Sequence, residues 1–446
     1  MPTSLVMSAA WARWAYSTLL RLLAPLYVLR LLWRSRHEPP YRQRLAERFG
    51  FAAAPAAPGR IWLHAVSLGE TRAAAPLIDE MRRQRPALAL LLTHGTATGL
   101  EAGAALLREG DAQAWLPYDT PGAVRRFLRR HRPVAGVVME TEIWPNLLHE
   151  AARAGVPMVL ANARLSERSA RKGRRLAALM RPAAGCLMLA LAQTEADAAR
   201  LRDAGVRDVR VLGNLKFDLT PAEALLHAGR RWRQALGRPV VLLAVSREGE
   251  EAALLTAWRR VLPVTGVASV VATGHDRPLL LIVPRHPQRF DEVAALVRSQ
   301  GLTIARRSAF GSATDVPPPA EAGSVDVWLG DSMREMPLYY ALADVALLGG
   351  SFAPLGGQNL IEAAACGCPL LMGPHTFNFE QAAEGALAAG AAERAADLDA
   401  ALAKALQWLA DRPALAVRAE SAQAFAASHR GAAVRMAEAV LAQVRR

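Results

Sequence analysis

Short apolar runs that alternate with Arg- and Ala-rich stretches constrain the fold of this chain more than any other feature. The first series begins at Ile61 and comprises IWLHAV, LALLLTH, VAGVVME, PMVLANA and CLMLALAQT. The stretches between these runs read as helices, and strands that alternate with helices are the signature of a doubly wound parallel sheet. The first half of the chain is therefore predicted to be such a sheet.

A second series of apolar runs begins after about residue 220, behind the turn-like segment GNLKFDLTP. Its runs are PVVLLAVS, LLLIVPR, DVWLGD, VALLGGS and PLLMGP. A chain of 446 residues is too long for one ordinary core, so two series indicate two domains. We predict an α/β protein with two doubly wound, Rossmann-like domains that face a central cleft. Ligands in such sheets bind beyond the carboxyl ends of the strands.

The breaks in these patterns predict four segments along the chain. They are an N-terminal membrane-associating helix, an N-terminal domain, a C-terminal domain and a C-terminal helix, over residues 1–36, 37–217, 218–425 and 426–446 respectively.

The composition of the first segment indicates an association with a membrane. Residues 11–36, WARWAYSTLLRLLAPLYVLRLLWRSR, are rich in Leu, Trp and Tyr, and they are interrupted by Arg13, Arg21, Arg30 and Pro25. The uncharged stretches fall short of the roughly 18 to 20 residues that a spanning helix needs, and no small-residue cleavage site follows. We interpret the segment as an in-plane or tilted membrane anchor, with arginines at headgroups and aromatic rings at the interface. The alternative is an apolar helix that caps the first domain.

The formal charge of +14 and the isoelectric point near 10.7 favour a polyanionic partner. Nucleic acid, an anionic membrane and a phosphorylated substrate all qualify. Nearly all of the positively charged residues are arginines. The chain has only three lysines, Lys172, Lys216 and Lys404, so each of them is of interest. The three cysteines, two of them in a Cys-Gly-Cys pair, favour a reduced cytosolic compartment.

The ends of the first-half strands carry carboxylates. Glu70 follows the first strand at a Gly-Glu step that leads straight into a helix. Acidic residues are common in a first helical turn for stability alone, and the residues by themselves favour that interpretation. Glu140 and Glu142 follow a later strand, but alternate residues leaving a strand point to opposite sides, which disfavours a metal pair.

The ends of the second-half strands read as a nucleotide site. Gly356 and Gly357 precede a helix, so their backbone N–H groups form a candidate phosphate loop. Asn359 and Glu362 open that helix and suit phosphate and a ribose diol, although the same spacing is also a capping box. Arg285 ends a very apolar strand, and its guanidinium has the geometry to donate two hydrogen bonds to a phosphate or a carboxylate.

Other standard machinery is missing from the sequence. It contains no GxxxxGK[ST] loop, no HExxH, no GxGxxG after the first strand and no convincing nucleophile elbow.

Eight motifs together resemble the 3-deoxy-D-manno-octulosonic acid (Kdo) transferases of lipopolysaccharide assembly. They are WLHAVSLGE, METEIWPNLL, NARLSERS, GNLKFD, PRHPQRF, GGSF, GGQNLIEAAA and MGPHTFNF, in the order of that family. The likeness extends from YRQRLAERFG to about residue 385. It implies a GT-B type glycosyltransferase that moves Kdo from CMP-Kdo to the tetra-acylated lipid A precursor at the cytoplasmic face of the inner membrane.

The resemblance also implies roles for residues. Glu70 matches the base of the SxGE motif, and Glu140 and Lys216 match the residues that stabilise the transition state. The first domain would then hold the acceptor and the second the donor. CMP contacts are implied for Pro284, Arg285, Met333, Arg334, Glu335, Asn359, Leu360, Ile361 and Glu362. The implied reaction inverts the anomeric centre with one base and no covalent intermediate, and it needs no metal and no cofactor.

Three positions depart from the family pattern. Arg247 stands where the family has His, Arg334 replaces a turn glycine, and GGHNPLE is GGQNLIE here. The Arg334 change is the most serious, because a positive φ that glycine tolerates costs an arginine free energy. The change affects the expected geometry of CMP binding more than it affects catalysis.

Three rival functions stay open at this point. A GT-B transferase for a UDP-sugar shares the architecture and differs in its base pocket. A nucleotide-sugar epimerase of the same fold would act without a lipid acceptor. A nucleic-acid binder would use the positive charge and would show salt-sensitive affinity, but it leaves the carboxylates at the strand ends unexplained.

Overall fold

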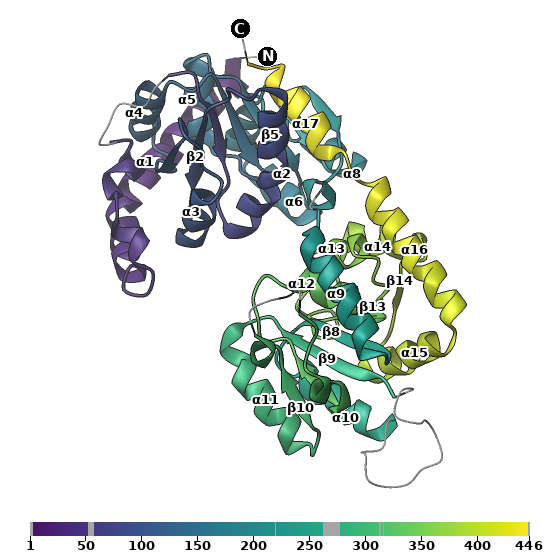
Figure 1. Cartoon of the computed structure of the whole chain (residues 1–446). Coiled ribbons are helices and arrows are strands. Elements are labelled where there is room, and N and C mark those ends of the chain that lie inside the picture. The colour runs from purple at the N-terminus through teal and green to yellow at the C-terminus, as the bar shows by residue number, and fades with distance from the viewer. Residues whose placement is uncertain are drawn as a thin grey trace. The chain divides into compact units, whose positions relative to one another are not determined.

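Two compact units make up the chain, each a parallel sheet covered by helices on both faces (Figure 1). Unit 1 comprises Met1–Asp218 and Arg430–Arg446, and unit 2 comprises Leu219–His429. The computed structural model describes residues 3–51, 58–218, 220–261, 277–311, 314 and 316–444.

Unit 1 has a seven-stranded parallel sheet in the order β3-β2-β1-β4-β5-β6-β7. The strands are β1 (Ile61–His64), β2 (Leu90–His94), β3 (Ala112–Trp115), β4 (Ala135–Met139), β5 (Met158–Ala163), β6 (Leu189–Ala192) and β7 (Val209–Val211). The helices of this unit are α1 (Thr3–Arg34), α2 (Leu68–Gln84), α3 (Ala97–Ala104), α4 (Pro121–His131), α5 (Pro145–Arg153), α6 (Glu167–Arg175), α7 (Ala177–Ala184), α8 (Glu195–Asp203) and α17 (Ala432–Leu441), with short 3-10 turns η1 (Pro39–Arg42), η2 (Leu45–Phe49) and η3 (Leu215–Asp218).

Apolar side chains on both faces explain why the sheet of unit 1 is doubly wound. One core joins the strands to α2 and α17, and a second core joins them to α4, α5 and α8. The central strands β1, β2, β4 and β5 are buried along their whole length, as their uninterrupted apolar runs require.

Unit 2 repeats this architecture with the order β10-β11-β9-β8-β12-β13-β14, again all parallel. The strands are β8 (Val240–Ser246), β9 (Leu279–Pro284), β10 (Ile304–Arg306), β11 (Val327–Leu329), β12 (Val345–Leu348), β13 (Leu370–Met372) and β14 (Ala392–Arg394). The helices are α9 (Glu223–Leu236), α10 (Glu250–Val261), α11 (Phe290–Ser299), α12 (Met336–Leu342), α13 (Leu360–Ala365), α14 (Glu380–Ala388), α15 (Leu398–Ala410) and α16 (Arg412–Ser428), with η4 (Pro287–Arg289), η5 (Arg307–Phe310) and η6 (Ala320–Ser324). The prediction of two doubly wound parallel sheets is confirmed.

The segment boundaries differ in detail from those expected. The division between the units falls after Asp218, one residue beyond the expected place. Residue 426, the expected start of a separate C-terminal helix, lies inside α16, which continues to Ser428. The chain then returns to unit 1, where α17 packs against α2 (Figure 1).

The N-terminal segment is one continuous helix, α1, which runs through Pro25. One side of it is tied to unit 1: the Tyr16 hydroxyl donates to Asp119 (2.9 Å), and the Ser17 hydroxyl donates to Asn146 (3.1 Å). Its other side exposes large apolar side chains, among them Trp11, Trp14, Leu22, Leu26, Leu29 and Trp33. By length and composition, Ser8–Arg34 is apolar enough to cross a membrane.

Candidate active site

The topology of unit 1 marks one crevice at the carboxyl edge of its sheet. The strand order reverses between β1 and β4, which lie side by side, and ligands of doubly wound sheets bind at such a reversal. Glu70 lies in the first turn of the helix that follows β1, and Glu140 directly follows β4. The topology therefore places both predicted carboxylates at the reversal.

The Glu70 carboxylate is held by the turn that opens α2. It accepts hydrogen bonds from the Val66 backbone N–H (2.8 Å) and the Ser67 hydroxyl (3.2 Å), and Ser67 in turn caps the helix. Burial raises the pKa of Glu70 to about 7. The nearby charges of Glu140 and Glu142 also raise this pKa, whereas the two hydrogen bonds lower it by less than burial raises it. The group thus titrates near neutrality, where a general base is most effective.

Glu140 has an uncommon backbone conformation, with φ at +57°. Its N–H donates to Ala161 (2.9 Å) and its carbonyl accepts from Arg164 (3.3 Å), so neighbouring strand ends hold the turn. Non-glycine residues in this region cluster at functional sites, where the surrounding structure compensates the strain.

The carboxylates behind β4 do not follow strand alternation. The strand ends at Met139, and residues 140 and 141 form a turn, so residues 140–142 do not continue the sheet. Burial raises the pKa of Glu142, and the charge of Glu140 adds to this shift. Within the described ranges, no group of three or more His, Cys, Asp or Glu side chains is arranged to hold a metal ion.

Lys216 lies in η3, beyond the carboxyl end of β7, and η3 packs against α2, the helix that carries Glu70. A chain of amide side chains fixes this loop. The Asn162 side chain accepts from the Leu215 N–H (3.1 Å), and Asn214 accepts from the Lys216 N–H (3.0 Å). Gln193 links the two asparagines, donating to the Asn162 carbonyl (2.9 Å) and accepting from the Asn214 side chain (3.0 Å).

Sequence reasoning did not assign this supporting role to the three amides. Asn162 and Asn214 stand in the motifs NARLS and GNLKFD, and the signal available was that all three lie at or just beyond the carboxyl ends of strands. Asn162 adopts φ +52°, a left-handed conformation that Asn tolerates better than most residues.

In unit 2, cations gather at the carboxyl ends of β8 and β9. Pro284 is buried at the end of β9, whereas Arg285 is exposed and its backbone N–H donates to Ser246 (3.0 Å). Arg247 lies 3.2 Å from the His286 ring. Burial lowers the pKa of His286, and the charges of Arg247, Arg285 and Arg289 lower it further. This gathering of arginines makes the edge suited to anions.

The turn behind β11 contains Met333, Arg334 and Glu335. Arg334 takes the left-handed conformation, with φ +67°, that its replacement of glycine required. The Glu335 carboxylate is bound by both arms of Arg307 (2.9 Å each) and by the Ser332 hydroxyl. Glu335 therefore anchors the turn, while the side chains of Met333 and Arg334 are exposed.

The candidate phosphate loop is closed by a backbone hydrogen bond. The Gly357 N–H donates to the Gly350 carbonyl (2.8 Å). Asn359 caps α13 by accepting from the Ile361 N–H (3.2 Å). Leu360 and Ile361 are fully buried, so their side chains belong to the core of unit 2.

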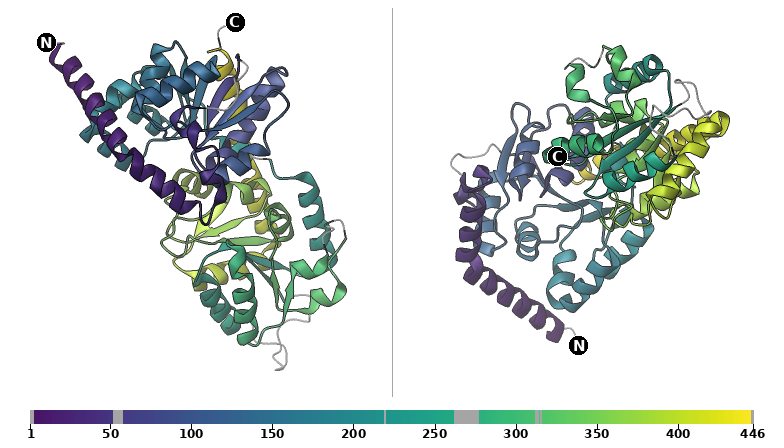
Figure 2. Two further views of the ribbon diagram at one scale, coloured as in Figure 1. Left: turned by 90° about the vertical axis from the view of Figure 1, so that its left-hand side faces the viewer. Right: turned by 90° about the horizontal axis from the view of Figure 1, so that it is seen from below.

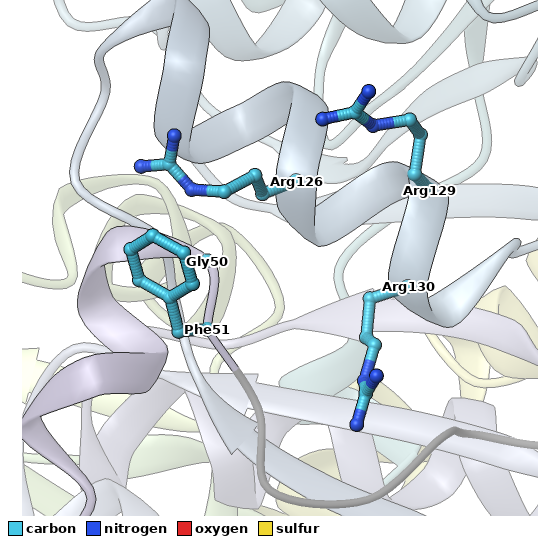
Figure 3. Close-up of a pocket in the computed structure, with 5 residues that line it drawn as sticks. All are labelled: Gly50, Phe51, Arg126, Arg129 and Arg130. Carbon is cyan, nitrogen blue, oxygen red and sulfur yellow. The ribbon is translucent and has the colours of Figure 1, made fainter.

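A separate basic pocket of about 290 Å³ lies in unit 1 at the C-terminal half of α4. Figure 3 shows the Arg126 guanidinium beside the Phe51 ring, with Arg129 and Arg130 on the next turns. Arg126 also donates to the Phe49 carbonyl (2.9 and 2.7 Å). A helix after a parallel strand runs back toward the amino edge of the sheet, so this pocket is not part of the carboxylate site.

These units define a GT-B-like protein of two parallel α/β sheets. A UDP-GlcNAc 2-epimerase from Neisseria meningitidis, solved with UDP-GlcNAc, shares this fold with a TM-score of 0.53 at 14% identity, over 86% of this chain and 99% of that one. Such low identity shows the fold alone.

The sequence comparisons narrow this class to one family. Residues 43–219 match the family model described as 3-deoxy-D-manno-octulosonic-acid transferase (kdotransferase). The 3-deoxy-D-manno-octulosonic acid transferase of Bordetella pertussis is 49% identical over 96% of this chain and 98% of its own length. That of Haemophilus influenzae is 35% identical over 83% and 84%. The chain belongs to the Kdo transferase family, and it is an enzyme of that class.

Proposed function

We propose that this enzyme transfers Kdo from CMP-Kdo to the tetra-acylated lipid A precursor in lipopolysaccharide assembly. The observation that carries the mechanism is the carboxyl of Glu70, which lies at the strand reversal with its pKa raised to about 7. Membership of the Kdo transferase family supplies the sugar, and the basic edge of unit 2 supports an anionic donor.

Glu70 acts as the general base. A hydroxyl of the acceptor sugar attacks the anomeric carbon of Kdo, and its proton passes to the ionised carboxylate of Glu70. The new glycosidic C–O bond forms as the bond from the anomeric carbon to the CMP phosphate oxygen breaks, and CMP takes the electron pair. Attack opposite the leaving group inverts the anomeric centre, so no covalent enzyme intermediate is needed.

Cations balance the charge of the reacting groups. Negative charge grows on the phosphate of CMP as it leaves, and preorganised donors stabilise it. Lys216 of unit 1 provides one such donor, and Arg285 and Arg247 provide donors at the strand ends of unit 2. Glu140 lies beside Glu70 and stabilises the positive charge that develops on the Kdo ring in a transition state with oxocarbenium character. The step as proposed requires no metal and no cofactor.

The acceptor lies in a membrane, and α1 suits that location. The exposed Trp and Leu side chains of this helix enter the interface, and the net charge of +14 attracts the anionic surface. We place the enzyme at the cytoplasmic side of the inner membrane, anchored by α1.

Transfer from CMP-Kdo, generated in situ, to the tetra-acylated precursor tests this proposal. Mass spectrometry should show the acceptor with added Kdo units, and CMP rather than UDP should raise the melting temperature. CMP-Kdo turnover that proceeds without any lipid would instead support an epimerase-like or hydrolytic activity. A folded enzyme that yields no Kdo adduct would overturn the proposal.

A further inference from the structure

A cavity of unit 1 that borders the turn of Glu140 and Glu142 has no role in the mechanism above. It has a volume of about 620 Å³, within the range of roughly 300 to 1,000 Å³ typical of small-molecule sites. We call it the α6–α7 pocket. Its lining comes from the turn after β4, from the loop that leads into α6, and from α6, α7 and α8. It includes Thr141, Ile143, Leu165, Lys172, Met180 and Arg200.

The pocket combines an apolar lining with a basic rim. Ile143, Leu165 and Met180 contribute hydrocarbon to the lining, together with the small side chains of Ala170, Ala177 and Ala184. Lys172, Arg174, Arg181 and Arg200 provide the cations. Such a lining fits an amphiphile that carries both a hydrocarbon chain and a negative charge.

Two of these four cationic side chains form hydrogen bonds to the protein, and the other two form none in the described part of the chain. Arg200 donates to the Leu165 carbonyl, and Arg181 donates to the Asp203 carbonyl (3.3 Å). In the part of the chain that the structure describes, the side chains of Lys172 and Arg174 form neither an ion pair nor a hydrogen bond. They are therefore available for an anionic group of a ligand.

Lys172 also stands out among the basic residues. It is one of three lysines among 54 basic residues. Lys404 pairs with Glu393 (3.3 Å), and Lys216 belongs to the carboxylate site. The remaining lysine, Lys172, lies on the rim of this pocket.

The pocket lies between the carboxylate site and the membrane helix. Thr141, part of its lining, stands between Glu140 and Glu142 in the turn after β4. On the other side, α7 packs against α1, which runs along unit 1 (Figure 2). A second, smaller cavity is lined by Ala9 and Arg13 of α1 and by Leu179 and Pro182 of α7. One helix thus contacts both α1 and the pocket.

We propose that the α6–α7 pocket binds an acyl chain of the phosphorylated glycolipid acceptor, with Lys172 and Arg174 contacting an acceptor phosphate. This inference rests on the proposed function, because it assigns the acceptor of that reaction a subsite. An amphiphile held here would remain continuous with the membrane along α1 while its sugar reaches the turn of Glu140.

Filling the pocket tests the acyl subsite. Ala177→Trp places a ring in the lining, and Ala178→Trp is the matched control, since Ala178 is exposed on the same helix and does not line the pocket. We expect Ala177→Trp to raise KM for the tetra-acylated acceptor at least tenfold. KM for a de-acylated acceptor and for CMP-Kdo should stay unchanged, as should all three values in Ala178→Trp. Equal effects of the two variants, or equal effects on both acceptors, would overturn the subsite.

Charge reversal tests the phosphate contact. Lys172→Glu should raise KM for the bisphosphorylated acceptor several-fold more than KM for a dephosphorylated one, and Lys172→Arg should restore it. Arg168→Glu, on the exposed side of α6 and outside the lining, is the matched control. The same KM in Lys172→Glu and Arg168→Glu would contradict the contact.

A binding measurement separates this inference from the proposed function. A tetra-acylated, bisphosphorylated glucosamine disaccharide with a diazirine in one acyl chain is photolysed with the wild-type protein in detergent. Cross-links on residues 165–184 that Ala177→Trp removes would support the pocket, even if no Kdo were transferred. Cross-links confined to α1, or unchanged in Ala177→Trp, would overturn it even if transfer were normal.

Discussion

The carboxyl of Glu70 shows how two opposing effects at one residue set its chemistry. The helix start and the Val66 N–H favour the charged form, whereas burial and the neighbouring carboxylates disfavour it. The helix start is visible in the sequence and favours an ionised group, whereas the burial is visible only in the structure. In the structure burial outweighs the hydrogen bonds, and the pKa rises to about 7.

This raised pKa predicts a pH dependence of transfer. The base must be deprotonated to accept a proton, so kcat/KM should rise with pH through about 7 and level off above it. An unshifted carboxyl would place the same rise near its ordinary pKa of about 4.3. The profile is measured between pH 5.5 and 9, and a flat profile over this range would contradict the assignment.

Glu140→Gln should lower kcat and also shift that profile. The negative charge of Glu140 raises the pKa of Glu70, so removing it moves the rise in kcat/KM to lower pH. Glu142→Gln is the control: its charge acts on Glu70 in the same direction with less weight, so it should give a smaller shift. A shift to higher pH in Glu140→Gln would refute the coupling.

At the scale of elements, η3 depends on the end of another strand. Asn162, near the carboxyl end of β5, holds the Leu215 N–H beside Lys216 and lies in a left-handed conformation. At the other end of η3, Asp218 accepts from the N–H groups of Gly431 (2.5 Å) and Ala433 (2.6 Å), so the returning helix α17 fixes the turn as well.

Asn162→Ala should weaken both stability and catalysis. It leaves the buried Leu215 N–H without its acceptor, which costs about 1 to 3 kcal/mol, and Ala tolerates φ +52° poorly. We expect a lower free energy of unfolding in urea and a lower kcat. Asn162→Gly relieves the backbone strain and still lacks the acceptor, so it should recover part of the stability and little of the kcat. Full activity in both variants would show that the amide does not position Lys216.

The elements that the sequence predicted well are those with local signals. Apolar runs predicted the two sheets, and the Gly-Glu step at Glu70 predicted the helix that the structure shows from Leu68. Contacts between distant segments left no such signal. The ion pair between Arg307 and Glu335 depends on how separate loops pack against each other. The same is true of the hydrogen bond from the Gly357 N–H to the Gly350 carbonyl. The return of α17 to unit 1 depends on an apolar face that matches α2.

At the scale of the whole molecule, the basic and apolar surfaces agree with a membrane-bound acceptor. The exposed apolar side of α1 and the opposite side tied to Asp119 and Asn146 leave one face for the bilayer. The net charge of +14 adds a long-range attraction that salt weakens.

The triple variant Trp11→Gln, Trp14→Gln, Trp33→Gln tests this face without disturbing the tied side. Each ring is about 60% exposed, so the variant should fold normally and bind anionic phospholipid vesicles at least tenfold less well in a sedimentation assay. Val417→Gln, a similarly exposed site on α16 of unit 2, should leave vesicle binding unchanged. Equal binding of the triple variant and the wild type would argue against α1 as the anchor.

The most direct measurement is the rate of Kdo transfer by Glu70→Gln beside the wild type, at pH 8 and saturating CMP-Kdo. Gln keeps an oxygen for the Val66 N–H, so we expect an unchanged melting temperature and donor affinity. Transfer should fall by about 10² to 10⁴. A folded Glu70→Gln that transfers Kdo within tenfold of the wild-type rate would show that Glu70 is not the base.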